Sequence, residues 1–375
     1  MPTKKKKKAP VAKKKTTVAK KGLPKRKYEW DLTKHGMTQS ALKEYLNCPE
    51  HFYLSYIEGW TATEISGPLL FGTQVHDMID KTGDNPDTLS TVYESMGESI
   101  MEHRGFNATT RQRYLDSLDL AYVVLLGYYK HWEKFNSGRV WIAREKSFRV
   151  ATKEISPLNV MVSKACEIPL RGKWDGLYFK KTRAKNPPIC QQEIKTAGRV
   201  DEATLQASLH LDFQSMFYAY AFLLEHGQVP ALTLRDVIRR PQLRRGKTEE
   251  RNEFLDRVSA DVSKRPTFYF MRWETKLTEK SVMTWYYKTL MGVLEQFYNW
   301  HEALLGTCEL GIDQDSLKWD PSDDAYLRWG SSLHYMNPEA LTRKMGTLSQ
   351  FFHLLTRGSY YGLYRRSTPH PELDD

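Results

Sequence analysis

Residues 172–180 read GKWDGLYFK and residues 189–196 read ICQQEIKT, and these two runs decide the fold. Aromatic residues in the first run and β-branched residues in the second predict two strands, joined by a loop rich in Lys, Arg and Pro. Glu193 and Lys195 are two residues apart in the second strand, so their side chains share one face. Asp175 lies in the first strand. Two strands that otherwise look buried therefore carry Asp175, Glu193 and Lys195 in their interiors.

Carboxylates inside a buried sheet are costly unless they pair or bind a cation. Two that lie close together repel, and the pKa of one rises unless a cation sits between them. Hard oxygen ligands suit Mg²⁺ or Mn²⁺, with water and a substrate phosphate at the remaining positions. A lysine beside such a metal can hold and deprotonate the attacking water, or neutralise charge on the phosphate. The residues alone leave a second interpretation open, with Glu193 and Lys195 on a solvated strand face and Asp175 in a turn.

Helical and extended patterns alternate around these two strands. Thr38 and Ser40 are candidate caps for the first helix, and Gly67 and Pro68 are expected to break the chain before the second. This order predicts an α/β fold with helical elaborations on either side of a sheet. We expect strands at 139–150, 158–170, 172–180, 189–196, 232–239 and 267–274, and helices at 40–59, 71–81, 91–136, 203–226, 278–305 and 338–356.

The chain divides into five parts by composition and pattern. We expect a disordered Lys-rich tail at 1–27, a helical N-terminal part at 28–136, the core at 137–240, a charged loop at 241–266, and a strand and helices packing on the core at 267–375. The charged part also fits a frayed helix.

The net charge of +11 belongs to one end of the chain. Residues 1–27 hold 13 of the 56 Lys and Arg and none of the 45 Asp and Glu, so the rest is nearly neutral. This tail has too few apolar side chains to offset the entropy cost of ordering. It fits a DNA tether that releases counterions from phosphates, a solubilising tail, a tether to a partner protein, or a nuclear-localisation run.

The four cysteines lie far apart and form no CxxC pair. This excludes a zinc ribbon, gives no sign of a disulfide framework, and favours a reducing compartment. No apolar run approaches the roughly 20 residues of a membrane span. We therefore expect a soluble cytoplasmic protein, nucleoid-associated or in the host cytoplasm if phage-encoded, or a nuclear one if the source is eukaryotic.

Five short motifs occur in a fixed order along the chain. They are SALKEYLNCPEHFYLSY at 40–56, FGTQVH at 71–76, G-x-x-D from Gly172 to Asp175, E-I-K from Glu193 to Lys195, and Q-x-x-x-Y from Gln214 to Tyr218. Together they resemble the PD-(D/E)XK nuclease superfamily, and within it the RecB-like branch that includes the CRISPR-associated exonucleases. The resemblance spans roughly residues 37–226 and implies a restriction-endonuclease-like core, a central mixed sheet flanked by helices.

The resemblance implies a ligand set for a metal ion. His76, Asp175 and Glu193 match metal ligands, and Ile194 matches the position whose backbone carbonyl also ligates. Imidazole among the ligands makes Mn²⁺ at least as suitable as Mg²⁺.

The resemblance also implies roles in catalysis and support. Lys195 matches the catalytic lysine, and Gln214 and Tyr218 match the pair that supports the site and approaches DNA. Glu145, in the preceding strand, is a second candidate for the site, with a solvated salt bridge as the alternative.

One departure from the branch concerns its iron–sulfur cluster, which many members hold with one N-terminal cysteine and three near the C-terminus. Cys48 lies where the first is expected, but Cys308 is the only cysteine in the last 180 residues. Four thiolates cannot be assembled from this set. We expect no iron–sulfur cluster, and Cys48 as a small buried hydrophobe.

The resemblance therefore implies a metal-dependent DNA nuclease, with exonuclease activity expected, in recombination, repair or phage DNA metabolism. DNA is the expected partner, together with a recombination or replication protein and no membrane. Two alternatives stay open: a catalytically silent DNA-binding or scaffold module of the same fold, and an RNA-processing nuclease.

A second phosphate-related motif is set aside. PQLRRGKT at 241–248 resembles the end of a phosphate-binding loop, but Pro241 stands where the first glycine is required, so no ATPase activity is expected. The basic run RRPQLRRGKTEER at 239–251 fits a DNA path or a solvated loop equally well.

Overall fold

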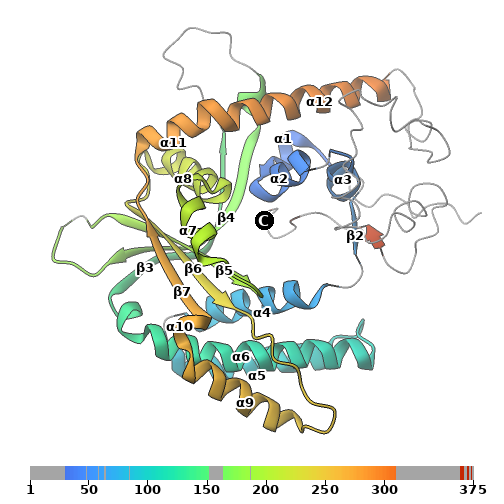
Figure 1. The fold of residues 1–375 in the computed structure, drawn as a ribbon. Coiled ribbons are helices and arrows are strands. Elements are labelled where there is room, and N and C mark those ends of the chain that lie inside the picture. The colour runs from blue at the N-terminus through green and yellow to red at the C-terminus, as the bar shows by residue number, and fades with distance from the viewer. Residues whose placement is uncertain are drawn as a thin grey trace, which may run out of the picture.

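The computed structural model describes residues 30–309, apart from 48, 58, 63, 64, 84, 152–163 and 186, together with 364–366, 370 and 373. The expected tail at 1–27 and the expected helix at 338–356 lie outside these residues. Within them, helices cover both faces of a central sheet (Figure 1). The expected α/β class, a mixed sheet flanked by helices, is confirmed.

A six-stranded mixed sheet lies at the centre of the described residues. Its strands are β1 (Met37–Thr38), β3 (Arg139–Ala151), β4 (Pro169–Lys180), β5 (Ile189–Ala197), β6 (Leu232–Arg239) and β7 (Phe270–Thr275). The order is β1-β4-β5-β6-β7, and β3 pairs with β4. The β5–β6 and β1–β4 pairs are parallel, and the other three pairs are antiparallel.

One edge of β4 is shared between two partners. β3 follows the opposite edge along the whole length of β4. On the shared edge, β5 pairs only with Gly176 to Phe179, and β1 pairs with Leu170 and Arg171. Because a strand has only two edges, β5 must leave β4 part-way, and the short β1 fills part of the space. Asp175 is the first residue of β4 beyond the β5 ladder.

Two apolar cores hold the helices against this sheet. The first core joins one set of helices to β3 and β4, and the second core joins another set to β5, β6 and β7; both sets are given at the end of this paragraph. Figure 1 shows α8 and α11 on one side of the sheet and α4, α5, α6 and α9 on the other. The first set is α2 (Gln39–Asn47), α3 (Pro49–Phe52), α8 (Phe213–His226), α11 (Glu279–Trp285) and α12 (Met291–Glu309); the second is α4 (Gly67–Thr82), α5 (Leu89–Glu102), α6 (Ala108–Asn136) and α9 (Arg251–Lys264).

The N-terminal helices begin and end differently from the expectation. A short helix, α1 (Leu32–His35), comes first. Thr38 caps the next helix, α2, as expected, since its Oγ1 accepts the Ala41 N–H at 3.1 Å. The expected helix at 40–59 is divided into α2, α3 and a π-helical turn (Tyr53–Ile57), and α3 starts at Pro49, which has no N–H to continue a helix. Gly67 and Pro68 do not break the chain before the next helix but begin α4, because proline is tolerated in a first turn.

The expected single helix at 203–226 is wrong at its centre. The structure has α7 (Glu202–Ser208), a 3-10 turn (Leu209–Leu211) and then α8. Asp212 is extended and caps α8, accepting the Ser215 N–H at 2.8 Å, and it also pairs with the buried Arg235. These polar contacts outweigh continued helix propagation at Asp212.

Two further expectations change. The expected strand at 158–170 contains a 3-10 turn (Lys164–Glu167) instead, and residues 158–163 lie outside the described residues. In the charged part at 241–266, the loop expectation is wrong from Arg251 onward, where α9 forms. A capping box starts α9, and Val258 and Val262, one turn apart, are buried against its neighbours.

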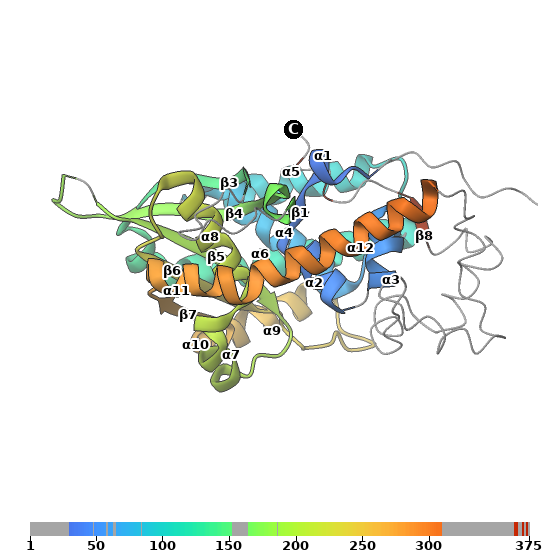
Figure 2. The same ribbon diagram turned by 90° about the horizontal axis from the view of Figure 1, so that it is seen from above.

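The C-terminal part of the described chain is largely helical. The expected strand at 267–274 forms only from Phe270, as β7, because its first three residues belong to a short helix, α10 (Pro266–Tyr269). The expected helix at 278–305 forms as α11, a π-helical turn (Tyr286–Leu290) and α12. Figure 2 shows α11 and α12 running as one rod past α8 and α2. A second small sheet pairs β2 (Trp60–Ala62) with β8 (Tyr364–Arg366). Among the described helices, none combines the length and apolar character needed to span a bilayer.

Candidate functional site

The site begins where β4 and β5 part. Gly176 faces Gln192 in the last pair of their ladder, so Asp175 and Glu193 are the next residues on each strand. Beyond that point β5 continues in register with β6 alone. The side chain of Asp175 replaces the missing ladder bond, because its Oδ2 accepts the backbone N–H of Ile194 at 2.6 Å. Both acids thus stand at the point where the two strands separate.

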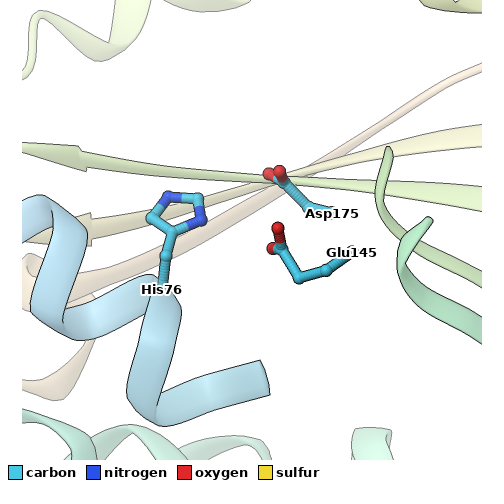
Figure 3. Close-up of side chains that lie close together, drawn as sticks. All are labelled: His76, Glu145 and Asp175. Atoms are coloured by element: carbon cyan, nitrogen blue, oxygen red, sulfur yellow. The ribbon is translucent and has the colours of Figure 1, made fainter. Parts of the chain in front are cut away.

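A histidine and two acids lie together at this point. One ligand atom each from His76, Glu145 and Asp175 lies within 4.8 Å of the others. Figure 3 shows the imidazole directed from its helix α4 toward the two carboxylates, which come from the strands. The structure therefore brings together two of the three residues expected as side-chain ligands, and adds Glu145 to them.

Close packing of α4 on β5 carries His76 to the strands. A Cβ added at Gly72 would lie 2.7 Å from Oγ1 of Thr196, so only glycine permits this approach. Gly72 precedes His76 by four residues, which places both on one face of α4. The glycine and histidine of the FGTQVH motif are therefore linked by geometry.

A bulge in β3 decides where Glu145 lies. The register with β4 shifts between Trp141 and Ala143, leaving one extra residue in β3. After the shift, Arg144 faces Gly176, so Glu145 comes opposite Asp175, and Glu145 has a left-handed φ of 44°. Its Oε2 also lies 2.8 Å from Nζ of Lys173, so Glu145 makes the ion pair considered as the alternative and also lies beside His76 and Asp175.

Glu193 is held apart from the cluster by its own partners. Its Oε1 accepts from Nζ of Lys195 at 2.6 Å and from Nε2 of Gln214. Its Oε2 is buried and has no hydrogen-bond partner among the described residues. The side chain of Glu193 is 1% exposed and that of Lys195 is 39% exposed, so the ammonium stands on the solvent side of the carboxylate. A buried carboxylate oxygen without a partner is costly, and a cation would relieve that cost.

Gln214 and Tyr218 support this arrangement from α8. Tyr218 forms a side-chain hydrogen bond with Gln214, and burial, followed by the charges of Glu193 and Asp175, raises the pKa of Tyr218 well above its ordinary value. A Cβ added at Gly172 would lie 2.6 Å from Phe148 and 3.1 Å from Tyr218. The glycine of the G-x-x-D motif thus leaves room for the aromatic side chains that cover the site.

The acids of the site are poorly accommodated as free anions. Burial raises the pKa of Asp175 well above its ordinary value, and the charge of Glu193 raises it further. Burial also raises the pKa of Glu145. Two clustered carboxylates, with the carboxylate of Glu193 nearby and only partial compensation by lysines, favour a bound cation.

The nitrogen groups are shifted in opposite directions. Burial, with Lys195 and Lys173 nearby, lowers the pKa of His76 to about 4, and a hydrogen bond with the backbone of Ile194 opposes this. Burial lowers the pKa of Lys195, but the charges of Glu193 and Asp175 outweigh it and raise the pKa overall. Neutral His76 is the form that ligates a metal. A backbone group that favours the protonated imidazole must be an acceptor, so the carbonyl of Ile194 lies beside the His76 ring.

The donor set fits a divalent metal ion. It offers one imidazole, the carboxylates of Asp175 and Glu145, the unpartnered Oε2 of Glu193 and the carbonyl of Ile194. Mostly oxygen donors with one nitrogen suit Mn²⁺ and Mg²⁺. Cys166 and Cys190 are buried free thiols, and Cys48 lies outside the described residues, so the absence of an iron–sulfur cluster stays a prediction.

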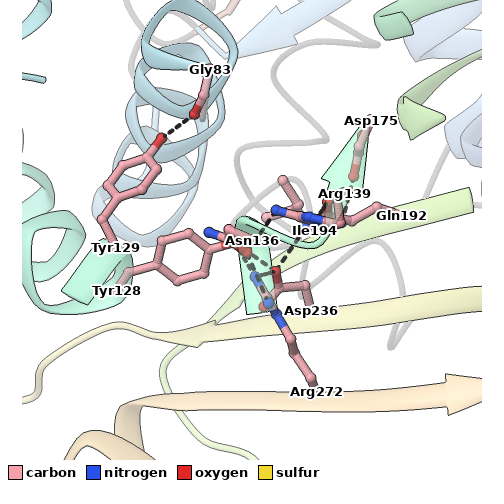
Figure 4. Close-up of polar contacts among 10 residues, drawn as sticks. All are labelled: Gly83, Tyr128, Tyr129, Asn136, Arg139, Asp175, Gln192, Ile194, Asp236 and Arg272. Atoms are coloured by element: carbon pink, nitrogen blue, oxygen red, sulfur yellow. Dashed lines mark hydrogen bonds and ion pairs between the residues drawn. The ribbon is translucent and has the colours of Figure 1, made fainter. Parts of the chain in front are cut away.

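A buried polar network, missed from the sequence, lies behind the site. Asp236 of β6 accepts from the Tyr128 hydroxyl at 2.6 Å, from Gln192 Nε2 at 2.7 Å and from Arg272 at 2.7 Å. Figure 4 shows these groups converging on Asp236, with Ile194 and Asp175 close by. Gln192 precedes Glu193 in β5, so the network holds this strand from behind. The signal was present, since Asp236 is an acid inside the apolar run LTLRDVIR.

Comparison with known proteins places the chain in a family. The sequence model of the PD-(D/E)XK nuclease superfamily matches residues 36–289, which extends beyond the motifs at 37–226 to include β7 and α11. No curated protein matches the chain.

Proposed function

The chain belongs to the PD-(D/E)XK nuclease superfamily, and from that premise we propose that it hydrolyses phosphodiester bonds of DNA with a divalent metal ion. We also propose that it is an exonuclease of the RecB-like branch, serving recombination, repair or phage DNA metabolism. The five ordered motifs support the branch, and the basic tail at 1–27 supports DNA as the substrate.

One observation carries the proposal. Asp175 and Glu193 are the first residues beyond the β4–β5 ladder. His76 of α4 lies beside Asp175, and Lys195 of β5 contacts Glu193 on the same strand. Oε2 of Glu193 is buried and has no partner among the described residues, so this oxygen is available to a cation beside Asp175. An acceptor left in this state is better explained by a ligand than by packing.

The proposed roles follow from position. His76, Asp175, Glu193 and the Ile194 carbonyl would hold the metal ion, with Glu145 as a further carboxylate. Such an ion polarises a phosphate and acidifies bound water. Lys195, tied to Oε1 of Glu193 and exposed on its outer side, is placed to orient the attacking water or to neutralise charge on the phosphate.

Gln214 and Tyr218 have a positioning role in this proposal. Gln214 donates to the same Oε1 that Lys195 contacts, so it orients Glu193 with Oε2 inward. Tyr218 hydrogen-bonds to Gln214 and restrains it.

Cleavage assays test the proposal directly. Linear, circular, single-stranded and duplex DNA, together with RNA, are incubated with Mg²⁺ or Mn²⁺ and with the wild type, Lys195→Ala, Asp175→Ala or Glu193→Ala. We expect each substitution to reduce DNA cleavage at least about 10²-fold. Lys180→Ala is the matched control, because Lys180 forms an exposed pair with Glu274 at the far end of β4.

Each result has a defined consequence. Equal cleavage by the wild type and Lys195→Ala would remove the lysine from the chemistry. Cleavage of RNA alone would favour the RNA-processing alternative, and a wild type inactive on every substrate would favour a silent scaffold. Degradation of linear but not circular DNA is the result expected of an exonuclease.

A further inference from the structure

We propose that a pocket between α4, α6 and the segment after β6 binds the sugar–phosphate backbone of a single nucleic-acid strand and leads it to the site. The pocket has a volume of about 980 Å³ and is lined by the first turn of α4, by α6 from Ala108 to Leu120, by residues 240–244 and by Phe254 of α9. These elements lie together in the lower layer of Figure 1. The inference rests on the proposed function and adds the form of the substrate and its route.

The pocket lies close to the site along two chain segments. Along α4, Leu70 in the pocket wall precedes His76 by six residues, a rise of about 9 Å. Along β5, Ala197 follows Ile194 by three residues, about 10 Å, and its carbonyl accepts the N–H of Arg240, which lines the pocket. The two paths agree.

Its lining is cationic. Arg113, Arg240 and Arg244 line the pocket against one acid, Asp116, which already accepts from Gln112 at 2.8 Å. Arg240 and Arg244 make no ion pair in the described part of the chain, and Nε of Arg240 is buried without a hydrogen-bond partner. The guanidinium of Arg240 is therefore buried at one nitrogen and faces the pocket, an arrangement that suits hydrogen bonds to phosphate oxygens. Of the two expectations for the basic run 239–251, the DNA path is the one these arginines favour.

Two helix ends add to this field. Gly67 is the first residue of α4, and Ala108 and Thr109 are the first two of α6, and all three line the pocket. Ser66, the N-cap of α4, makes no side-chain capping bond, so that end of the helix keeps free amide donors. Helix N-termini carry partial positive charge and attract anions. Here they reinforce the arginines beside them.

The remaining lining and the size favour one strand over a duplex or a small anion. Leu70, Leu120, Leu243 and Phe254 give an apolar wall on which bases can lie, as in other single-strand sites. A volume near the upper end of the ~300–1,000 Å³ typical of ligand sites exceeds the need of one phosphate. A duplex keeps its bases paired and stacked inside and presents phosphates and groove edges, so it would not use this apolar wall.

Binding in the absence of metal isolates this pocket from cleavage. A fluorescein-labelled ten-nucleotide DNA strand is titrated in EDTA, over a series of salt concentrations, and anisotropy is recorded. We expect Arg240→Ala/Arg244→Ala to weaken binding at least fivefold and to lower the salt slope by about 1.4, because each lost single-strand phosphate contact removes about 0.7. The tail at 1–27 is present in every variant and cancels in the comparison.

A matched control separates the pocket from general charge loss. Arg183→Ala/Lys185→Ala removes the same charge from the exposed loop before β5, at the other end of that strand. We expect this variant to bind within twofold of the wild type. Equal weakening in both double variants overturns the proposal. Arg244→Ala alone, at an exposed position, keeps the test valid if the double variant does not fold.

Photo-crosslinking gives a local readout that the tail does not influence. Bromodeoxyuridine is placed at successive positions of the strand, and crosslinked peptides are identified by mass spectrometry. We expect crosslinks in 240–254, at Phe254 in particular; crosslinks confined to other segments overturn the proposal. Because neither experiment needs catalysis, a protein that binds here but cuts nothing refutes only the proposed hydrolysis. One that cuts DNA but binds equally well without Arg240 and Arg244 refutes only the pocket.

Discussion

Replacing Asp236 by asparagine tests the buried network behind the site. Asp236 is fully buried, and its partner Arg272 has a side chain only 4% exposed, so solvent does little to screen the pair. Asparagine keeps the shape and can still accept from Tyr128 and Gln192, but it leaves the guanidinium without a counter-charge. The pKa of Arg272 is raised, since the charge of Asp236 outweighs the effect of burial, so the group stays protonated. Breaking such a pair typically costs about 3–5 kcal/mol.

The free energy of unfolding, measured by urea denaturation, is the assay. We expect Asp236→Asn to lose about 3–5 kcal/mol, by far the larger part of it from the unpaired guanidinium. Glu274→Gln is the matched control on the neighbouring strand β7. Glu274 pairs with Lys180 at 2.9 Å, but both side chains are more than 40% exposed, so the expected loss is under about 1 kcal/mol.

A second variant separates charge from packing. Asp236→Leu/Arg272→Met removes both members of the pair, and should be less destabilised than Asp236→Asn although it changes more atoms. A loss for Asp236→Asn no greater than that of the Glu274→Gln control would refute the reasoning. So would a double variant that is less stable than the single one.

Three further predictions concern the helices and the metal ion. Gly72→Ala should weaken Mn²⁺ binding by moving α4 off β5, because the added Cβ would lie 2.7 Å from Oγ1 of Thr196. Adding Thr196→Ala should restore binding, since that oxygen is then absent; isothermal titration of the single and double variants checks this, and a failed rescue points to another cause. Asp212→Asn should destabilise the protein by about 1–3 kcal/mol near neutral pH. The pKa of Asp212 is lowered below its ordinary value because Arg235 and the cap at Ser215 together outweigh burial, so this stability is present above the unfolded pKa and is lost as pH falls through the lower folded value; urea denaturation from pH 7 to 3 should show the two proteins converging. Mn²⁺ at about 100 times its dissociation constant should stabilise the wild type by about 2.7 kcal/mol. At the same concentration Mn²⁺ should stabilise the Glu193→Gln variant less in thermal melts, whereas an equal shift in melting temperature would exclude Glu193 as a ligand.

Local pattern was enough to predict several elements. The strands expected at 139–150, 189–196 and 232–239 form as β3, β5 and β6, and the helical region at 91–136 forms as α5 and α6. Alternation and helical periodicity report on burial of one face, which is a local property of the chain. The errors fall where tertiary contacts compete. At Asp212 a cap and an ion pair interrupt the helix expected at 203–226. Burial of Val258 and Val262 stabilises a helix in the charged segment, for which the sequence left a loop and a frayed helix open.

The sequence by itself determined the α/β class and the residues around which the candidate site is built, since Asp175, Glu193 and Lys195 stand out as charges in apolar strands. Only the tertiary structure decided which groups meet. The bulge after Trp141 turns Glu145 toward Asp175, and Glu193 lies where β4 and β5 separate, with its Oε2 unpartnered among the described residues. Register and strand divergence depend on contacts between residues far apart in the chain, and a one-residue slip reverses the face of every side chain that follows. No local pattern carries that information.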